Sequence, residues 1–265
     1  MADFIFVKEE RLKIFVTNDD GIYSHGIRVL AEALKEVGDV LVIAPDRERT
    51  AAGHALTLHK PLRLEEIEKG YFAANGTPTD CVNLGINGIL KTLPDIVVSG
   101  INKGGNLGED VTYSGTVSAA VEGTILGVPS IAISLVADVD YKFEAAASIA
   151  VKLTKIILKK GLPKDTLLNI NVPNVTKEEI KGVKITRLGK RVDDGDSIRE
   201  NINTRGKRYY WIGGSRMTWE KTEDSDFAAI EENMISVTPL CLDLTNYAVI
   251  DDLKKWNIKF NNGNG

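Results

Sequence analysis

The sequence predicts an α/β fold, in which a mostly parallel sheet carries helices on both faces. Short apolar runs rich in β-branched residues alternate with longer segments of helical period from Leu12 to about Val172. This alternation is typical of right-handed βαβ units. The 265 residues suffice for one large domain with an appendage, and a hydrophobic content of 43% is ordinary for a globular protein.

Strands are expected where β-branched and aromatic residues form short buried runs, at residues 14–16, 40–43, 96–98, 131–133 and 168–172. Helices are expected at residues 25–37, 80–90, 115–126 and 143–160. In the first of these, Ile27, Leu30, Ala31 and Leu34 fall on one helical face. The last ends in two lysines before Gly161, which suits a helix C-terminus.

The pattern changes after Pro173, so we divide the chain into a core (1–173) and a C-terminal extension (174–265). In the extension we expect strands at 183–188, 208–212 and 235–240, a tight turn at Gly213-Gly214, and a loop over 193–203. Residues 246–256 are expected to form a terminal helix capped by Thr245 or Asn246. Such a hairpin-rich extension buries little core by itself, and we therefore expect a homo-oligomer.

Charge and cysteine content exclude several classes of protein. A net charge of -4 gives no general attraction to nucleic acid or to an anionic membrane. Cys81 and Cys241 form no disulfide framework or zinc site, which fits a reducing cytoplasm. We find neither a signal-peptide pattern in residues 1–11 nor an apolar segment long enough to span a bilayer.

The first expected strand runs directly into Asn18, Asp19, Asp20 and Gly21. Adjacent carboxylates repel each other, and a fold that places them together usually supplies a cation or a shared proton. Carboxylate oxygens suit Mg²⁺ or Mn²⁺ better than zinc. The simpler alternative is a solvated turn with a helix N-cap.

Two further strands also end in polar segments, 44–50 and 99–106. Ligands of open parallel sheets bind beyond the carboxyl ends of the strands, so these segments are expected to converge. Asp19, Asp20, Thr50 and Asn102 can together form an all-oxygen metal site.

Two expected helices begin with hydroxyl-rich turns. Ser114, Gly115 and Thr116 open one helix, and free amides at a helix N-terminus bind anions. The segment 76–80 opens another, where simple capping is at least as good an explanation. No Walker A loop is present and no GxGxxG follows the first strand, which disfavours an intact dinucleotide.

The three histidines, His25, His54 and His59, are better explained as structural than as catalytic. His59 falls in a strand-like run, 56–64. His54 follows Thr50 closely and has the best chance of reaching the site. No Ser–His–Asp order or GxSxG elbow can be read.

Together these segments resemble the SurE family of metal-dependent 5′(3′)-nucleotidases, also called survival proteins. The matching blocks are Thr17-Asn18-Asp19-Asp20-Gly21, Ala44-Pro45-Asp46-Arg47, Gly76-Thr77-Pro78-Thr79-Asp80-Cys81-Val82, Val98-Ser99-Gly100-Ile101-Asn102-Lys103-Gly104, Ser114-Gly115-Thr116-Val117-Ser118-Ala119-Ala120 and Asn169-Ile170-Asn171-Val172-Pro173. The resemblance implies a Rossmann-like core, one divalent metal ion, and hydrolysis of nucleoside monophosphates to nucleoside and phosphate. It also implies dimers or tetramers built with the C-terminal extension.

Carried over by position, the resemblance places the metal ligands at Asp19, Asp20, Thr50 and Asn102. Thr50 is a departure, because the family usually has Ser there, and the extra methyl group can crowd the site or change the metal preference. Asp19 and Asp20 are also the candidate catalytic residues. The candidate substrate-binding residues are Asn18, Lys103, Asn106, Ser114, Gly115 and Thr116.

The expected chemistry is direct attack of metal-activated water on the phosphate, with Asp19 or Asp20 as a base. Lys103 and the amides of residues 114–116 are expected to stabilise the transition state. A covalent aspartyl-phosphate is the alternative route. The alternative functions are a broader phosphatase, an exopolyphosphatase, or a nucleotide-binding regulator that has lost turnover.

Overall fold

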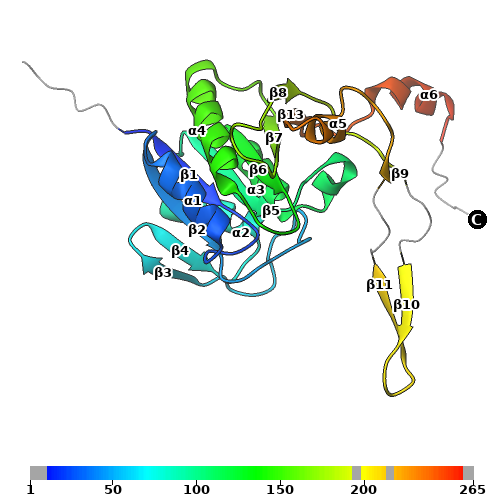
Figure 1. Cartoon of the computed structure of the whole chain (residues 1–265), viewed down its shortest axis with the longest axis horizontal. Coiled ribbons are helices and arrows are strands. Elements are labelled where there is room, and N and C mark those ends of the chain that lie inside the picture. The colour runs from blue at the N-terminus through cyan, green and yellow to red at the C-terminus, as the bar shows by residue number, and fades with distance from the viewer. Residues whose placement is uncertain (1–10, 193–197, 213–217, 259–265) are drawn as a thin grey trace, which may run out of the picture.

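A nine-stranded sheet forms the centre of the molecule, with the strand order β3-β4-β2-β1-β5-β6-β7-β13-β8 (Figure 1). The computed structural model describes residues 11–192, 198–212 and 218–258. The six neighbouring strands from β4 to β7 run parallel, while β3 and β13 are antiparallel to their inner neighbours. The predicted α/β class with a mostly parallel sheet is confirmed.

All five strands expected in the core are present. They are β1 (Lys13–Thr17), β2 (Asp39–Pro45), β5 (Ile96–Lys103), β6 (Ser130–Val136) and β7 (Thr166–Pro173). A hairpin of β3 (Leu64–Glu68) and β4 (Tyr71–Ala74) extends the sheet beyond β2. The run 56–64, interpreted above as strand-like, contains no regular strand before Leu64, so that interpretation is wrong.

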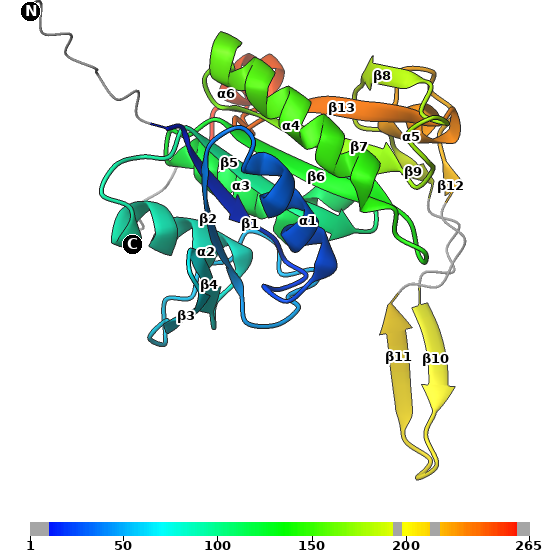
Figure 2. The same cartoon turned by 60° about the vertical axis from the view of Figure 1, so that its left-hand side comes forward.

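Alternate residues of the strands pack against helices on opposite faces of the sheet. Ile14 and Val16 join the core beneath α1 (His25–Leu34) and α4 (Phe143–Lys160), and Phe15 between them joins the core on the other face. That second face is covered by α2 (Pro78–Asn83), which continues as a π-helical turn (Leu84–Ile89), and by α3 (Gly115–Ile125). Figure 2 shows α1 and α4 side by side over the sheet.

The predicted helices agree with the observed ones to within a few residues. α4 has the predicted bounds and ends at Gly161, whose φ of 75° lies in the left-handed region. In α1, the four apolar residues predicted to share a face are all buried. At the start of α2, Thr77 and Asp80 form a capping box, which agrees with the explanation of segment 76–80 as a helix cap.

The C-terminal part of the chain adds strands to the main sheet and also forms a hairpin outside it. β8 (Gly182–Ile185) and β13 (Met234–Cys241) pair at the edge beyond β7, close to the predicted positions. A hairpin of β10 (Ile198–Ile202) and β11 (Arg208–Ile212) projects away from the body of the molecule (Figure 1).

Strand β10 corrects the prediction of a loop over 193–203, and the predicted turn at Gly213-Gly214 lies outside the described residues. The remaining elements are short. They are β9 (Arg191–Val192), β12 (Thr218–Trp219), α5 (Asp226–Glu231), the 3₁₀ turns at Gly108–Thr112 and Tyr247–Val249, and α6 (Ile250–Lys255).

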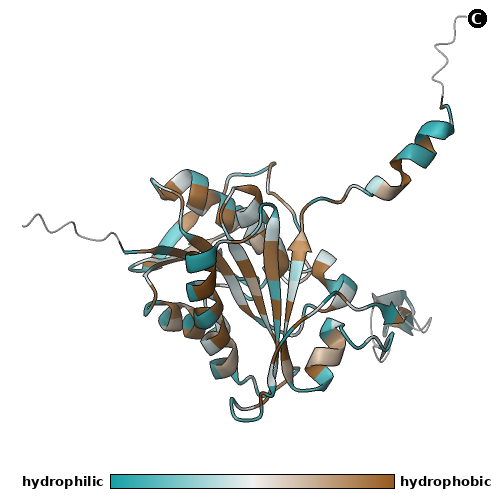
Figure 3. Cartoon of the chain, turned by 90° about the horizontal axis from the view of Figure 1, so that it is seen from above, coloured by the Kyte–Doolittle hydropathy of each residue, from teal (hydrophilic) through white to brown (hydrophobic). Residues whose placement is uncertain are grey.

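The predicted terminal helix is present as the second 3₁₀ turn followed by α6, and the Asn246 side chain caps it. Figure 3 shows α6 at the end of an arm that leaves the sheet after β13. Within the described residues, no helix has the length and apolarity needed to cross a membrane.

Candidate active site

One cavity of about 760 Å³ lies at the carboxyl edge of the parallel strands. Its walls come from the loops that follow β1, β2 and β5 and from the start of α3. β1 lies between β2 and β5, so the chain changes direction across the sheet at this point, which is where open α/β sheets bind ligands. All four predicted metal ligands, Asp19, Asp20, Thr50 and Asn102, line the cavity.

Asp19 is held by the first turn of α3. The Thr116 hydroxyl donates a hydrogen bond to Asp19 Oδ1, and burial raises the pKa of the Asp19 carboxyl. Gly115 permits this close approach, since a Cβ atom there would lie 2.7 Å from Asp19 Cβ. Asp19 Oδ2 is thereby left for a ligand.

Asp20 is held from the β5 side. The backbone N–H of Lys103 donates to Asp20 Oδ2 at 3.1 Å. Burial, and then the charge of Asp19, raise the pKa of Asp20 to about 6. A carboxylate pair with raised pKa values favours a nearby cation, because a cation offsets the repulsion between them.

Thr50 reaches the cavity on the loop after β2. That loop is joined to the turn after β1 by the hydrogen bond from the Arg49 backbone N–H to the Asp19 carbonyl, at 2.7 Å. The Thr50 hydroxyl donates to Glu48 Oε1 at 2.5 Å, so its oxygen lone pairs remain available. Glu48 lines the cavity as well.

The oxygen donors fit a hard divalent cation. Asn102 Nδ2 donates to the Gly104 carbonyl at 2.8 Å, which leaves the amide oxygen free to act as a ligand. Two carboxylates, a hydroxyl and an amide oxygen form a set that suits Mg²⁺ or Mn²⁺. Within the described residues, no three His, Cys, Asp or Glu side chains gather into a metal-binding cluster, so the neutral oxygens of Thr50 and Asn102 are needed to complete such a site.

Three of the predicted substrate-binding residues line the cavity, and three lie behind its wall. Lys103, Asn106 and Ser114 line it. Thr116 uses its hydroxyl on Asp19, next to Gly115. Asn18 is buried, and its amide donates to the Gly21 carbonyl and the Ser24 hydroxyl, so it shapes the turn that presents the two aspartates.

His54 lies outside the cavity and fixes the loop that carries Thr50. Its Nε2 lies 2.8 Å from Glu122 Oε2 on α3, and Asn83 of α2 donates to the other Glu122 oxygen at 2.8 Å. The hydrogen bond with His54 is the main reason that the pKa of Glu122 is lowered. This agrees with the structural interpretation of His54.

The C-terminal part fixes another wall of the cavity. The buried Asp226 carboxylate accepts hydrogen bonds from the Gly108 and Gly189 N–H groups, both at 2.8 Å. Arg191 binds Asp110, which itself lines the cavity, at 2.9 Å. The loop after β5 is therefore held by residues far away in the sequence.

Seven cavity residues were not in the predicted site: Glu48, Ala51, Gly104, Gly105, Asp110, Tyr113 and Tyr141. Glu48 belongs to the polar segment 44–50 that was predicted to reach the site, so the sequence alone could have identified it as a cavity residue. Tyr141 stacks on Phe143, with ring centroids 5.7 Å apart, and belongs to a segment with no recognisable motif. Only the fold brings it to the cavity.

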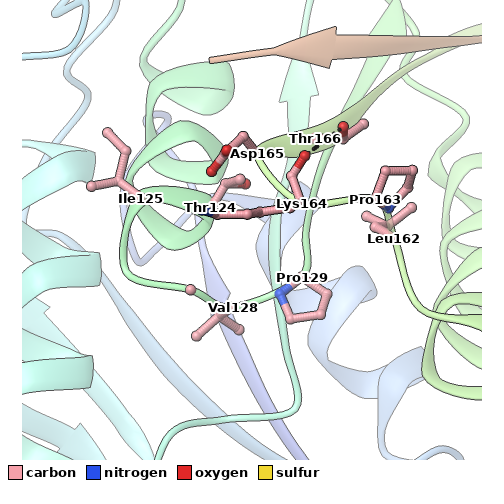
Figure 4. Close-up of a pocket in the computed structure, with 10 residues that line it drawn as sticks. Thr124, Ile125, Val128, Pro129, Leu162, Pro163, Lys164, Asp165 and Thr166 are labelled. Carbon is pink, nitrogen blue, oxygen red and sulfur yellow. Dashed lines mark hydrogen bonds between the residues drawn. The ribbon is translucent and has the colours of Figure 1, made fainter. Parts of the chain in front are cut away.

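A second, smaller cavity of about 200 Å³ lies at the opposite edge of the sheet, where β6 and β7 begin (Figure 4). Thr124, Pro129, Leu162 and Thr166 are among the residues that line it. Among the described residues that line it, Lys164 and Asp165 carry charge. It has no part in the site described above.

The fold and the carboxyl-edge cavity define a class: an α/β protein with a carboxylate-lined, oxygen-rich cavity at the point where the strand order reverses. The family model described as "Survival protein SurE" matches residues 14–194, more than half of the chain. The chain belongs to the SurE family.

Similar proteins agree with this assignment along almost the whole chain. The 5′-nucleotidase SurE of Geobacter sulfurreducens is 55% identical over 248 residues, which cover 93% of this chain and 94% of that protein. The 5′-nucleotidase SurE of Geobacter metallireducens is 52% identical, with 93% and 98% covered. The crystal structure of the SurE protein from Aquifex aeolicus has a TM-score of 0.81 at 44% identity, covering 93% of this chain and all of that one.

Proposed function

We propose that this chain is a divalent-metal-dependent 5′-nucleotidase that hydrolyses nucleoside monophosphates to nucleoside and phosphate. The observation that carries the proposal is the convergence of Asp19, Asp20, Thr50 and Asn102 on one cavity, beside Lys103 and the start of α3. Relatives named 5′-nucleotidase SurE, which share about half of their residues with this chain, support the same activity.

A single Mg²⁺ or Mn²⁺ ion held by these four side chains would lower the pKa of a bound water and neutralise phosphoryl charge. Asp19 or Asp20 accepts the proton of the attacking water. The Lys103 ammonium, the Asn106 amide and the Ser114 hydroxyl bind the phosphoryl oxygens, at the N-terminus of a helix that favours anions.

The route of attack can be decided with isotopes. We propose that water attacks phosphorus directly, because in Asp19 and in Asp20 one oxygen accepts a hydrogen bond and the other is assigned to the cation, which leaves neither carboxylate free to attack. The stereochemical course at phosphorus separates the routes, measured by hydrolysing, in ¹⁷O-labelled water, a nucleoside phosphorothioate that is chiral through ¹⁶O and ¹⁸O. Direct attack is a single displacement and inverts the configuration at phosphorus, whereas the two displacements through an aspartyl-phosphate retain it.

Tyr113 and Tyr141 are the candidates for stacking a nucleobase. Both line the cavity, and Tyr113 is 66% exposed. Aromatic rings stack on any base, so we expect activity with several nucleotides. Comparing 5′-AMP, 5′-GMP, 3′-AMP, p-nitrophenyl phosphate and short polyphosphate tests this. Equal kcat/KM for p-nitrophenyl phosphate and 5′-AMP would support a general phosphatase instead, and preference for polyphosphate an exopolyphosphatase.

The C-terminal extension, residues 174–265, is proposed to join subunits into a dimer or tetramer. Large apolar side chains are exposed on the β10–β11 hairpin and the α6 arm, including Trp211 at 63% and Leu244 at 94%. Exposed apolar groups gathered in this way mark interfaces. Light scattering should give a dimeric or tetrameric mass that Trp211→Glu reduces, and a monomeric wild type would refute the proposal.

We further propose that the protein acts in the cytoplasm.

A further inference from the structure

Two buried asparagines on β7, Asn169 and Asn171, have no role in the site described so far. Both are 0% exposed. The intervening Ile170 and the following Val172 pack into the core with α4, so the two amides face the other side of the sheet, which α3 covers. Burying an amide is unfavourable unless it is hydrogen-bonded, and two such residues at alternate positions of a central strand need partners.

Both amides bind the same residue, Asn106, on the cavity wall. Asn171 Oδ1 accepts from the Asn106 backbone N–H at 2.8 Å, and its Nδ2 donates to the Asn106 carbonyl at 3.0 Å. Asn169 Nδ2 donates to that same carbonyl at 2.8 Å. The Asn106 side-chain Nδ2 donates to Ser134 Oγ on β6 at 2.7 Å. Two central strands therefore fix the backbone and one side-chain N–H of Asn106.

We propose that Asn169 and Asn171 are positioning residues for the substrate phosphate. They hold Asn106 so that its second Nδ2 hydrogen meets a phosphoryl oxygen in the cavity. A donor held in place before the substrate arrives costs no reorganisation during the reaction. This inference rests on the proposed function, since it requires a phosphate monoester in the cavity.

Asn169 distinguishes positioning from a purely structural role. Its Oδ1 is buried and has no hydrogen-bond partner among the described residues. The carbonyl that it binds already accepts from Asn171. An unpaired buried oxygen is destabilising, so stability alone would favour an apolar side chain at this position. The need to hold Asn106 in place explains why residue 169 is an asparagine.

The test compares Asn169→Leu and Asn171→Leu with Thr238→Val. Thr238 is the register partner of Asn169 on β13, is 2% exposed, and bonds to Thr186 rather than to the cavity wall. The readouts are KM and kcat for 5′-AMP, the inhibition constant of inorganic phosphate, the Kd for Mn²⁺ by electron paramagnetic resonance, and Tm.

We expect Asn169→Leu to raise the phosphate inhibition constant and KM about threefold to tenfold, with Tm and the Kd for Mn²⁺ unchanged. Asn171→Leu should raise them further and also lower Tm. Thr238→Val should leave phosphate binding unchanged. The double variant Asn106→Ala/Asn169→Leu should bind inorganic phosphate as tightly as Asn106→Ala alone, because Asn169 acts on phosphate only through the Asn106 side chain.

Three results would overturn the inference while the wild type remains active: unchanged phosphate binding in Asn169→Leu, additive losses in the double variant, or an equal loss in Thr238→Val. If Asn171→Leu does not fold, Asn169→Leu decides. A wild type that neither hydrolyses 5′-AMP nor binds inorganic phosphate overturns the proposed function itself, and that result is visible before any variant is made.

Discussion

At the scale of single residues, Thr50 is the position where this chain departs from the pattern that it resembles. Its hydroxyl donates to Glu48, so a cation at the cavity would meet the oxygen lone pairs and not the proton. A carboxylate that accepts the proton of a ligand also raises the basicity of that ligand. The extra methyl group therefore leaves the hydroxyl oxygen able to serve as the proposed ligand.

We predict that Thr50→Ser keeps the Kd for Mn²⁺ within about threefold of the wild type, while Thr50→Val raises it about tenfold or more. Valine has nearly the shape of threonine, so the pair separates the oxygen from the methyl group. Calorimetric titration with Mn²⁺ measures both. If Thr50→Val bound Mn²⁺ as tightly as the wild type, Thr50 would not be a ligand.

At the scale of elements, sequence reasoning found the buried strands and the exposed strand β11, whose observed bounds are the predicted 208–212, but it missed the exposed strands β3 and β10. The strands of the core are continuous apolar runs because helices cover both faces. β3 reads Leu-Glu-Glu-Ile-Glu and lies at the edge of the sheet. β10 reads Ile-Arg-Glu-Asn-Ile and, in the part of the chain that the structure describes, pairs with β11 alone, so burial leaves no pattern in either strand. Tyr141 and Asp110 likewise reach the cavity through the fold and not through a motif.

The contact between the start of α3 and the loop after β1 gives a second prediction. Gly115→Ala would place a methyl group against Asp19 and push the N-terminus of α3 away, so we expect activity to fall at least tenfold. Gly88→Ala is the matched control, because a Cβ atom there has no neighbour within 4 Å. Steady-state kinetics on 5′-AMP, with Tm measured in parallel, checks both. Equal effects of the two substitutions would contradict this account.

The loop from β2 to β3 gives a third prediction. His54→Ala removes the contact between this loop and Glu122, so Thr50 is held less firmly. We expect the Kd for Mn²⁺ to rise about threefold to tenfold with little change in Tm, since His54 is partly exposed. His59→Ala, on the same loop but with no recorded contact to α3 in the described structure, should change neither quantity. A lower Tm of His54→Ala with an unchanged Kd for Mn²⁺ would show that His54 stabilises the fold and does not position Thr50.

At the scale of the whole molecule, the cavity is built by both halves of the chain. Asp226 and Arg191 from the C-terminal part hold the loop after β5, and the first 50 residues supply three of the four candidate metal ligands. Binding of a cation at this junction should stabilise the entire fold, because only the folded chain brings the ligands together.

That stabilisation should depend on pH with a definite sign. The pKa of Asp20 is raised to about 6, so the metal-free folded protein takes up a proton below that pH, and its own stability falls as pH rises through 6. A cation must displace that proton. We therefore expect the rise in Tm caused by Mn²⁺ to be large at pH 7.5 and to shrink towards pH 5. Thermal unfolding with Mn²⁺ and with EDTA at each pH measures it, and an equal rise at both pH values would contradict the assignment.

The most direct test of the central claim is phosphate release from 5′-AMP, measured together with Mn²⁺ binding, in the wild type and in Asp19→Asn. The variant keeps the size of the side chain and removes its charge. We predict that the wild type releases phosphate with Mn²⁺ and not with EDTA, and that Asp19→Asn loses at least about a hundredfold in kcat/KM together with most of its metal affinity. Metal-dependent turnover at the wild-type rate in Asp19→Asn would show that the reaction does not occur at this site.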